Sequence, residues 1–290
     1  MFKTERPGTV KRILVWVTST GVLLYLFFCA YMWVIQRQIV FEPTVQLQTT
    51  PERLGLKFEE ARIPSGSGVE RGELFSWWIP ADHPDAPTVL YFHGNDRNIG
   101  HVHDVDIAYR MHGLGYNLLL AEYRGYGKST GGEPSESKVY EDAEAAWNYL
   151  LNERAIAPRR IFIYGHSMGG AIAINLAIHH PEAAGLVTES TFTSMVDMGR
   201  RDYSYLPVSL LLNQRFESLG KVAGLKIPVL FIHGTWDKRI PWQMSQNLFD
   251  QAPQPKYLKL IEGGEHSNSS RIAWLEYRDA LSAFVQKYTR

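Results

Sequence analysis

The sequence predicts an α/β fold with a mostly parallel central sheet flanked by helices, a short lid insertion, and one transmembrane helix in front of the domain. Three observations support this prediction. Short apolar runs alternate with helical stretches, a Gly-x-Ser-x-Gly turn joins one run to a helix, and residues 13–35 carry no charge. Short apolar runs that alternate with helices favour a parallel sheet that helices cover on both faces.

Residues 13–35 form the first predicted element, a transmembrane helix. At about 1.5 Å per residue, a helix of this length can cross the ~30 Å hydrocarbon layer of a bilayer. A cleaved signal peptide is the alternative, but the apolar stretch is long for one, and Phe28–Tyr31 lacks a small-x-small cleavage site. We therefore expect an uncleaved anchor. Its Cys29 is the single cysteine, so no internal disulfide can form.

Basic residues flank this helix unevenly. Four precede it and one follows closely: Lys3, Arg6, Lys11 and Arg12 before it, and Arg37 after it. The positive-inside rule then predicts a cytoplasmic N-terminal segment at residues 1–12. The folded domain would be extracytoplasmic, which means periplasmic in a bacterium or lumenal in a eukaryote.

The remaining chain is predicted to form one domain behind a linker. Residues 36–57 are polar and contain prolines, and the domain is expected at 58–290, a usual size for one α/β unit. An antiparallel hairpin is predicted at Phe58–Ile63 and Gly72–Ile79, and a helix from Ser135, as its N-cap, to Glu153. Six later apolar runs predict strands: 88–92, 117–121, 161–164, 185–188, 228–232 and 257–261.

The turn Gly165-His-Ser-Met-Gly169 contains a candidate nucleophile. It joins the apolar run that begins at Ile161 to the helical stretch Met168–His179. A serine in such a turn lies on strained backbone that exposes its hydroxyl at the carboxyl end of the strand, and the flanking glycines leave room around it. Ser167 is the expected nucleophile, although the same pattern also occurs in ordinary turns.

A serine nucleophile needs a base and an acidic group that orients the base. His266 lies on a glycine-rich loop after the apolar run 257–261, and Asp237 lies on a loop after the run 228–232. We expect these two residues to complete a triad with Ser167. Glu189, which follows another apolar run, is the alternative acid.

Backbone N–H groups that bind the developing oxyanion would complete the site. The run 88–92 leads into His93-Gly94-Asn95, and Met168 follows the nucleophile. Such donors are each worth about 100- to 1000-fold in rate. We expect the N–H groups of Asn95 and Met168 to form the oxyanion hole, and His93 to pack its loop rather than act as a base.

These motifs resemble those of α/β-hydrolase-fold serine hydrolases over roughly residues 58–290. The resemblance also rests on Phe92-His-Gly-Asn95, on Glu122-Tyr-Arg-Gly-Tyr-Gly-Lys-Ser129, and on the chain order Ser, Asp, His. With its anchor, the chain is most similar to the membrane-anchored bud-emergence-type branch, and more distantly to protein depalmitoylases. The resemblance implies the α/β-hydrolase fold, a catalytic triad and hydrolysis of ester-type bonds.

One long insertion interrupts the alternation of strands and helices. Residues 191–225 are too long for a plain connection between two strands, so we expect a lid over the serine. Its apolar side chains either line an acyl pocket or pack a helix against the sheet. The pocket hypothesis concerns Tyr203, Tyr205, Leu206, Leu210 and Leu211.

Composition and charge limit the classes of partner. The 30 basic and 30 acidic residues cancel, so the charge gives no indication of nucleic-acid binding. No cofactor is implied, and the sequence does not indicate an oligomeric state. No metal site is expected either, because a helix would spread the candidate ligands over several faces: His101, His103, Asp104, Asp106 and His112.

Together these expectations describe a membrane-anchored serine hydrolase that cleaves carboxylic ester or thioester bonds in a small-molecule or lipid substrate. His266 would accept the proton of Ser167, and an acyl-enzyme would form and then react with water. Several alternatives stay open: an acyl-peptide or aminopeptidase-type serine peptidase, a lysophospholipase or monoacylglycerol lipase, a non-hydrolytic use of the fold, and a binding module.

Overall fold

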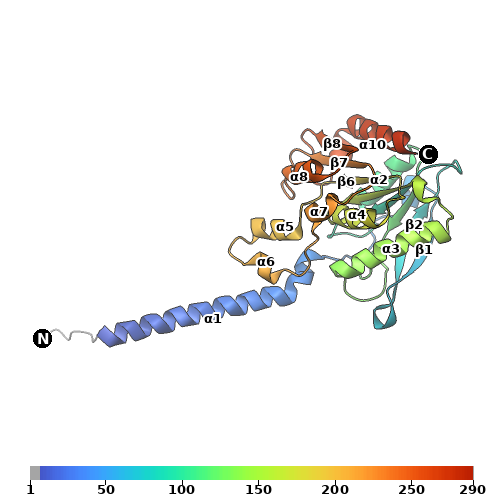
Figure 1. Cartoon of the computed structure of the whole chain (residues 1–290). Helices are drawn as coiled ribbons and strands as arrows, with labels where there is room; N and C mark the ends of the chain where they lie inside the picture. Colours follow the sequence, from blue (N-terminus) through green and yellow to red (C-terminus); the bar gives the residue numbers. More distant parts are fainter. Residues whose placement is uncertain (1–6, 290) are drawn as a thin grey trace.

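The computed structural model describes residues 7–289 and contains a long N-terminal helix followed by one α/β domain. The helix, α1 (Pro7–Val40), projects away from the domain as a rod, whereas the C-terminus lies on the domain itself (Figure 1). Lys3 and Arg6, on which part of the predicted membrane orientation rests, lie outside the described residues.

The domain is built on an eight-stranded sheet with the order β1-β2-β4-β3-β5-β6-β7-β8. The first two strands form the predicted antiparallel hairpin, β2 pairs antiparallel with β4, and all other neighbours are parallel. Every predicted apolar run forms a strand. The bounds are β1 Glu59–Ser65, β2 Gly72–Ile79, β3 Thr88–Phe92, β4 Asn117–Ala121, β5 Ile161–His166, β6 Gly185–Glu189, β7 Val229–Gly234 and β8 Lys256–Ile261.

Helices cover both faces of this sheet, which confirms the predicted layer arrangement. One hydrophobic core lies under α3, α4, α7 and α8 and includes Trp147, and the other lies under α2 and α10 and includes Leu281. The bounds are α2 Val102–His112, α3 Glu136–Asn152, α4 Met168–His179, α5 Met195–Asp202, α6 Val208–Leu211, α7 Ser218–Val222, α8 Gln243–Gln251, α9 Ser269–Ile272 and α10 Trp274–Tyr288. Three short 3₁₀ helices lie at Pro51–Leu54, Gly68–Glu70 and Pro158–Arg160.

Two of these helices begin as the sequence predicts. Ser135 caps α3, with its hydroxyl oxygen accepting from the Lys138 N–H at 3.4 Å. Helix α4 begins directly after the central strand β5. Because β3, β5, β6, β7 and β8 are parallel, their carboxyl ends meet at one edge of the sheet, where open α/β folds bind ligands.

Residues 36–57, expected as a linker, are packed against the domain rather than free. Helix α1 continues to Val40 and is followed by the fully buried Phe41. Farther on, the Asn98 side-chain amide donates to the carbonyl of Thr44 at 2.9 Å. The helix extends beyond its predicted end at residue 35 because Val40 and Phe41 are buried against the domain. Helix α1 is therefore attached to the domain by packed residues and not by a free linker.

Helix α1 leaves much of its apolar surface uncovered. Residues 11–40 are long and apolar enough to cross a membrane, judged by length and composition. Large side chains such as Trp16 and Phe27 are exposed along it, whereas Cys29 is buried. Helix α6 lies beside the part of α1 nearest the domain, and α5 packs against α6 (Figure 1).

Candidate active site

Ser167 lies in a strained turn between β5 and α4. Its backbone has φ 56° and ψ −121°, a conformation that residues other than glycine rarely adopt. A Cβ added to Gly165 would overlap the carbonyl of Gly169, and one added to Gly169 would overlap the carbonyl of Phe92. Glycine is thus required on both sides of the serine, as the motif suggests.

The structure brings the three predicted triad residues together at the carboxyl edge of the sheet. Nε2 of His266 lies 3.1 Å from Oγ of Ser167, and its Nδ1 lies 2.8 Å from Oδ2 of Asp237. His266 comes from the loop after β8 and Asp237 from the loop after β7. With the imidazole neutral, Nδ1–H donates to the carboxylate, and Nε2 can accept the serine proton.

Asp237 is held as a charged acceptor. Its Oδ1 accepts from the backbone N–H groups of Arg239 at 2.9 Å and Ile240 at 2.8 Å, and His233 Nε2 lies 3.2 Å from Oδ2. Burial alone would raise the pKa of Asp237, but the hydrogen bonds from His233 and His266 outweigh it and hold the pKa well below its usual range. The carboxylate is therefore ionised at neutral pH.

His266 is held as a neutral base. Burial lowers its pKa, Asp237 opposes that shift, and the charges of Arg239 and Arg97 add to the lowering. The net pKa is below the usual value for histidine. At pH 7 the imidazole is consequently unprotonated and able to accept a proton from Ser167.

The loop after β3 lies against the nucleophile. Gly94 approaches Ser167 so closely that an added Cβ would be 3.4 Å from the serine Cβ. Asn95, Ser167 and Met168 all line one cavity. The Met168 N–H is in the first turn of α4, where N–H groups have no partner within the helix and the helix dipole favours negative charge. These positions suit the predicted oxyanion hole.

His93 packs inside this loop. Its Nε2 is 2.5 Å from Oε1 of Glu122, its Nδ1 is 2.7 Å from the Gly94 carbonyl, and its ring is fully buried. The Glu122 carboxylate also accepts from the Ile99 N–H at 3.1 Å. The His93–Glu122 pair therefore fixes the loop that carries Asn95, in line with the expectation that His93 is not the base.

A cavity of about 270 Å³ extends from Ser167 between the lid and α1. Of the five lid residues proposed for the pocket, Tyr203, Leu206 and Leu211 lie on its wall. Tyr205 and Leu210 do not, so the expectation is wrong for these two. In α6, one residue rotates the side chain by roughly 100°, which turns Leu211 inward and leaves Leu210 83% exposed.

Sequence reasoning missed one wall of this cavity, which α1 supplies. Met32, Gln36, Ile39 and Val40 all line it. From the sequence, this helix is predicted only as an anchor. The available signal was Gln36, an uncharged polar residue near the end of an apolar helix. Its side chain accepts from the Asn213 N–H at 2.7 Å and donates to the Leu211 carbonyl at 3.3 Å, so it ties α1 to the lid.

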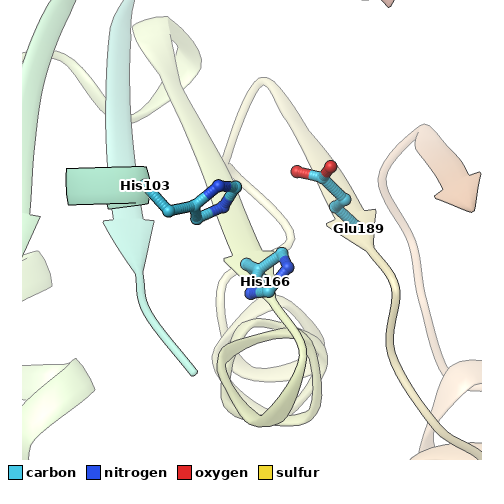
Figure 2. A group of neighbouring side chains, drawn as sticks. All are labelled: His103, His166 and Glu189. Atoms are coloured by element: carbon cyan, nitrogen blue, oxygen red, sulfur yellow. The ribbon is translucent and has the colours of Figure 1, made fainter. Parts of the chain in front are cut away.

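A second group of titratable side chains lies buried beside the triad. His103 at the start of α2, His166 at the end of β5 and Glu189 at the end of β6 have ligand atoms within 4.8 Å of one another. Figure 2 shows the Glu189 carboxylate extending toward the two imidazole rings. Its Oε2 accepts from the hydroxyls of Tyr164 at 2.6 Å and Tyr277 at 3.0 Å, so Glu189 does not orient His266.

This group connects to the triad through His166. Its Nε2–H donates to the His266 carbonyl at 2.8 Å, while burial keeps its pKa well below the usual value. Through this hydrogen bond we assign the group a supporting contact to the His266 backbone. Of the candidate ligands named from the sequence, only His103 belongs to this group, and the other four do not: His101, Asp104, Asp106 and His112.

Comparisons with known proteins agree with this fold. Residues 83–218 match the family model described as serine aminopeptidase, S33. An uncharacterized protein of Mycobacterium tuberculosis, Rv2307c, is 30% identical over 93% of this chain and 92% of its own. Protein bem46 of Schizosaccharomyces pombe is 32% identical over 66% of this chain and 64% of its own. An esterase of Pyrococcus furiosus has a TM-score of 0.71 at 21% identity and covers 87% of this chain and 98% of its own.

The fold and the comparisons define a hydrolase of the α/β class. The eight-stranded sheet with a serine turn after its central strand has the architecture expected from the sequence. The chain belongs to the α/β-hydrolase family, and its similarity to bem46 matches the bud-emergence-type branch that the sequence motifs indicate.

Proposed function

We propose that this protein is a membrane-anchored serine hydrolase that cleaves carboxylic ester or thioester bonds through Ser167, His266 and Asp237. One observation carries the proposal: both nitrogens of His266 are within hydrogen-bond distance of their triad partners, at 3.1 Å and 2.8 Å. The resemblance to an esterase of known structure supports the fold on which this chemistry would occur.

The reaction would proceed by double displacement. Ser167 Oγ attacks the substrate carbonyl while its proton passes to Nε2 of His266, and the oxyanion accepts hydrogen bonds from the N–H groups of Met168 and Asn95. His266 then returns the proton to the leaving group, which departs as the acyl-enzyme forms. A water molecule attacks the acyl-enzyme by the same steps in reverse, and Asp237 stabilises the imidazolium each time it forms.

We further propose that α1 crosses a membrane with its N-terminus in the cytoplasm, which would place the hydrolase domain on the extracytoplasmic side. The charge-free stretch 13–35 and the exposed apolar surface of α1 support the crossing. Lys11 and Arg12 at the far end of the helix support the direction.

The test of the nucleophile compares two buried serines with positive φ, Ser167 and Ser190. In detergent-solubilised protein, Ser167→Ala should lower hydrolysis of 4-nitrophenyl butyrate at least about 1000-fold and abolish fluorophosphonate labelling, because no other group supplies the attacking oxygen. Ser190→Ala is the matched control and should retain labelling. Equal melting temperatures for the two variants exclude misfolding, and labelling that persists in Ser167→Ala would assign the nucleophile elsewhere.

A serine aminopeptidase is the second candidate, and the cavity offers an observation in its favour. Besides its apolar wall, the cavity is lined by the carboxylates of Glu42 and Asp202, which could pair with the ammonium group of a peptide N-terminus. The matched family model carries that activity in its description. Alanine 4-nitroanilide, with a free amine, and its N-acetylated form separate the two functions. Cleavage of the free amine alone would favour the peptidase over the esterase.

A further inference from the structure

The lid of this protein packs against α1, the helix that is proposed to cross the membrane. The Tyr25 hydroxyl donates to the Tyr205 carbonyl at 2.9 Å, and the Phe28 and Tyr205 rings stack with centroids 6.3 Å apart. Farther along α1, Gln36 binds the backbone of Leu211. The lid segment from Tyr205 to Leu211 therefore lies along α1, beside the part between Tyr25 and Gln36.

We propose that the lid enters the bilayer and that the cavity receives the acyl chain of a lipid ester or thioester directly from the hydrocarbon layer. This inference rests on the proposed hydrolase function and names its substrate class, a long-chain acyl lipid resident in the membrane.

Helix geometry fixes how deep the lid lies. The charge-free stretch ends at residue 35, and Tyr25 is ten residues earlier, so it lies about 15 Å farther along the helix axis. The stretch is only slightly longer than the ~30 Å hydrocarbon layer, which leaves roughly 5 Å of freedom in its position. Tyr205, bonded to Tyr25, is therefore about 10 to 15 Å below the boundary of the hydrocarbon layer, as is the lid around it.

The chemistry of the lid suits that depth. Residues 203–212 contain no charged side chain, although Asp202 and Arg201 directly precede them, and Arg215, which follows, donates to the Ser209 carbonyl at 3.1 Å. Leu210 is 83% exposed and Tyr205 is 59% exposed, so apolar side chains make up much of the uncovered surface beside the exposed Ser204 and Ser209. A water-facing lid gains nothing from such exposure, but a lipid-facing lid does.

Most of the lid backbone has hydrogen-bond partners within the protein. Irregular backbone at membrane depth is tolerated only where its polar groups find partners in the protein. Of the nine N–H groups between residues 203 and 212, six donate to carbonyls of the lid or the adjoining α5: those of Tyr203, Leu206, Val208, Leu210, Leu211 and Leu212. The Tyr25 hydroxyl adds a partner for the Tyr205 carbonyl.

The cavity joins this depth to the nucleophile. Met32 on α1, which lies within the charge-free stretch, lines the cavity together with Tyr203 and Leu206 on the lid and with Ser167. An acyl chain could pass between α1 and the lid along these apolar side chains until its carbonyl reaches the serine, with the polar leaving group toward Glu42 and Asp202.

The experiment uses full-length protein reconstituted in phosphatidylcholine vesicles. Its two probes are 4-nitrophenyl palmitate dissolved in the bilayer and 4-nitrophenyl acetate dissolved in water. Leu210→Glu puts a charge on an exposed position of the lid. Because a charged side chain is unfavourable in hydrocarbon, the lid should insert less readily, and palmitate turnover should fall at least about tenfold. Acetate turnover should stay within about twofold of the unmodified protein, because Leu210 does not line the cavity.

A matched control is the same change on a surface remote from α1. Leu275→Glu alters a leucine that is 63% exposed at the start of α10 and should leave both rates unchanged. A fluorophore attached at position 210 in a Cys29→Ala background gives an independent readout. Nitroxides on the lipid acyl chains should quench it, and should not quench the same fluorophore at position 275.

Failure of this inference is distinguishable from failure of the proposed function. If the unmodified protein hydrolyses neither probe, the proposed hydrolase function fails. If it hydrolyses both, and Leu210→Glu does so at undiminished rates without quenching at position 210, the hydrolase function stands and membrane delivery of the substrate is refuted.

Discussion

The catalytic edge of the sheet and the lid are held in opposite ways. At the edge, Ser167 and Asp237 are buried, and each triad contact is a hydrogen bond between loops that follow parallel strands. The lid segment 203–212 is uncharged, exposes Leu210, and makes hydrogen bonds with α1. Under the proposed function, the sheet would fix the chemistry, whereas α1 and its surroundings would control which substrates arrive. Changes at the edge should affect all substrates alike, and changes in the lid should affect selectivity.

The largest of these effects is expected from Asp237→Asn. An amide cannot accept the Nδ1–H as a carboxylate does, and it does not stabilise the imidazolium, so kcat should fall about 10⁴-fold for acetyl and long-chain esters equally. Glu189→Gln is the matched control and should cost less than about tenfold, because Glu189 contacts Tyr164 and Tyr277 rather than His266. Steady-state kinetics on both esters, with melting temperatures, check the result. The reverse ranking of the two variants would make Glu189 the acid.

The catalytic edge was predictable because its residues follow short apolar runs that clearly indicate buried strands. The stretches before Ser167 and Asp237 form the buried strands β5 and β7, so the edge at which the side chains emerge follows from the strand direction alone. Chain order then suffices to pair them with His266. The strained φ of Ser167 also follows from its motif, since both neighbouring glycines are required by overlap with backbone.

The pocket was only partly predictable, for a physical reason. A short helix such as α6 has too few residues for periodicity to define its buried side, so Leu210 and Leu211 could not be told apart. The wall supplied by α1 escaped prediction because an apolar helix gives the same pattern whether lipid or protein covers it. The contact of His166 with the His266 backbone could not be predicted, because the motif specifies only the glycines and the serine around His166.

A smaller effect should distinguish the role of the lid from that of the catalytic edge in detergent solution, where no membrane is present. Leu206→Ala removes apolar wall from the cavity, and burial of methylene groups contributes about 0.8 kcal/mol each. In detergent solution, kcat/KM for the octanoyl ester should fall about tenfold, whereas that for the acetyl ester should change less than about twofold, because a short acyl group does not reach the lid. Leu275→Ala, on α10, is the control. Equal losses on both esters would show that the lid supports the triad instead of the acyl chain.

The smallest effect concerns the pH dependence of the base. His266 must be neutral to accept the serine proton, so kcat/KM rises with pH through the pKa of His266, and the acid limb should lie below pH 6.5 because that pKa is lowered, mainly by burial. Arg239 contributes to the lowering, so Arg239→Gln should raise the pKa and move the limb to higher pH. The Arg239 side chain is 42% exposed, so solvent screens its charge and keeps the shift small, and smaller still at high salt. Arg278→Gln, on the exposed face of α10, should leave the limb in place. A limb that stays in place in Arg239→Gln would mean that a group other than this imidazole controls the acid limb.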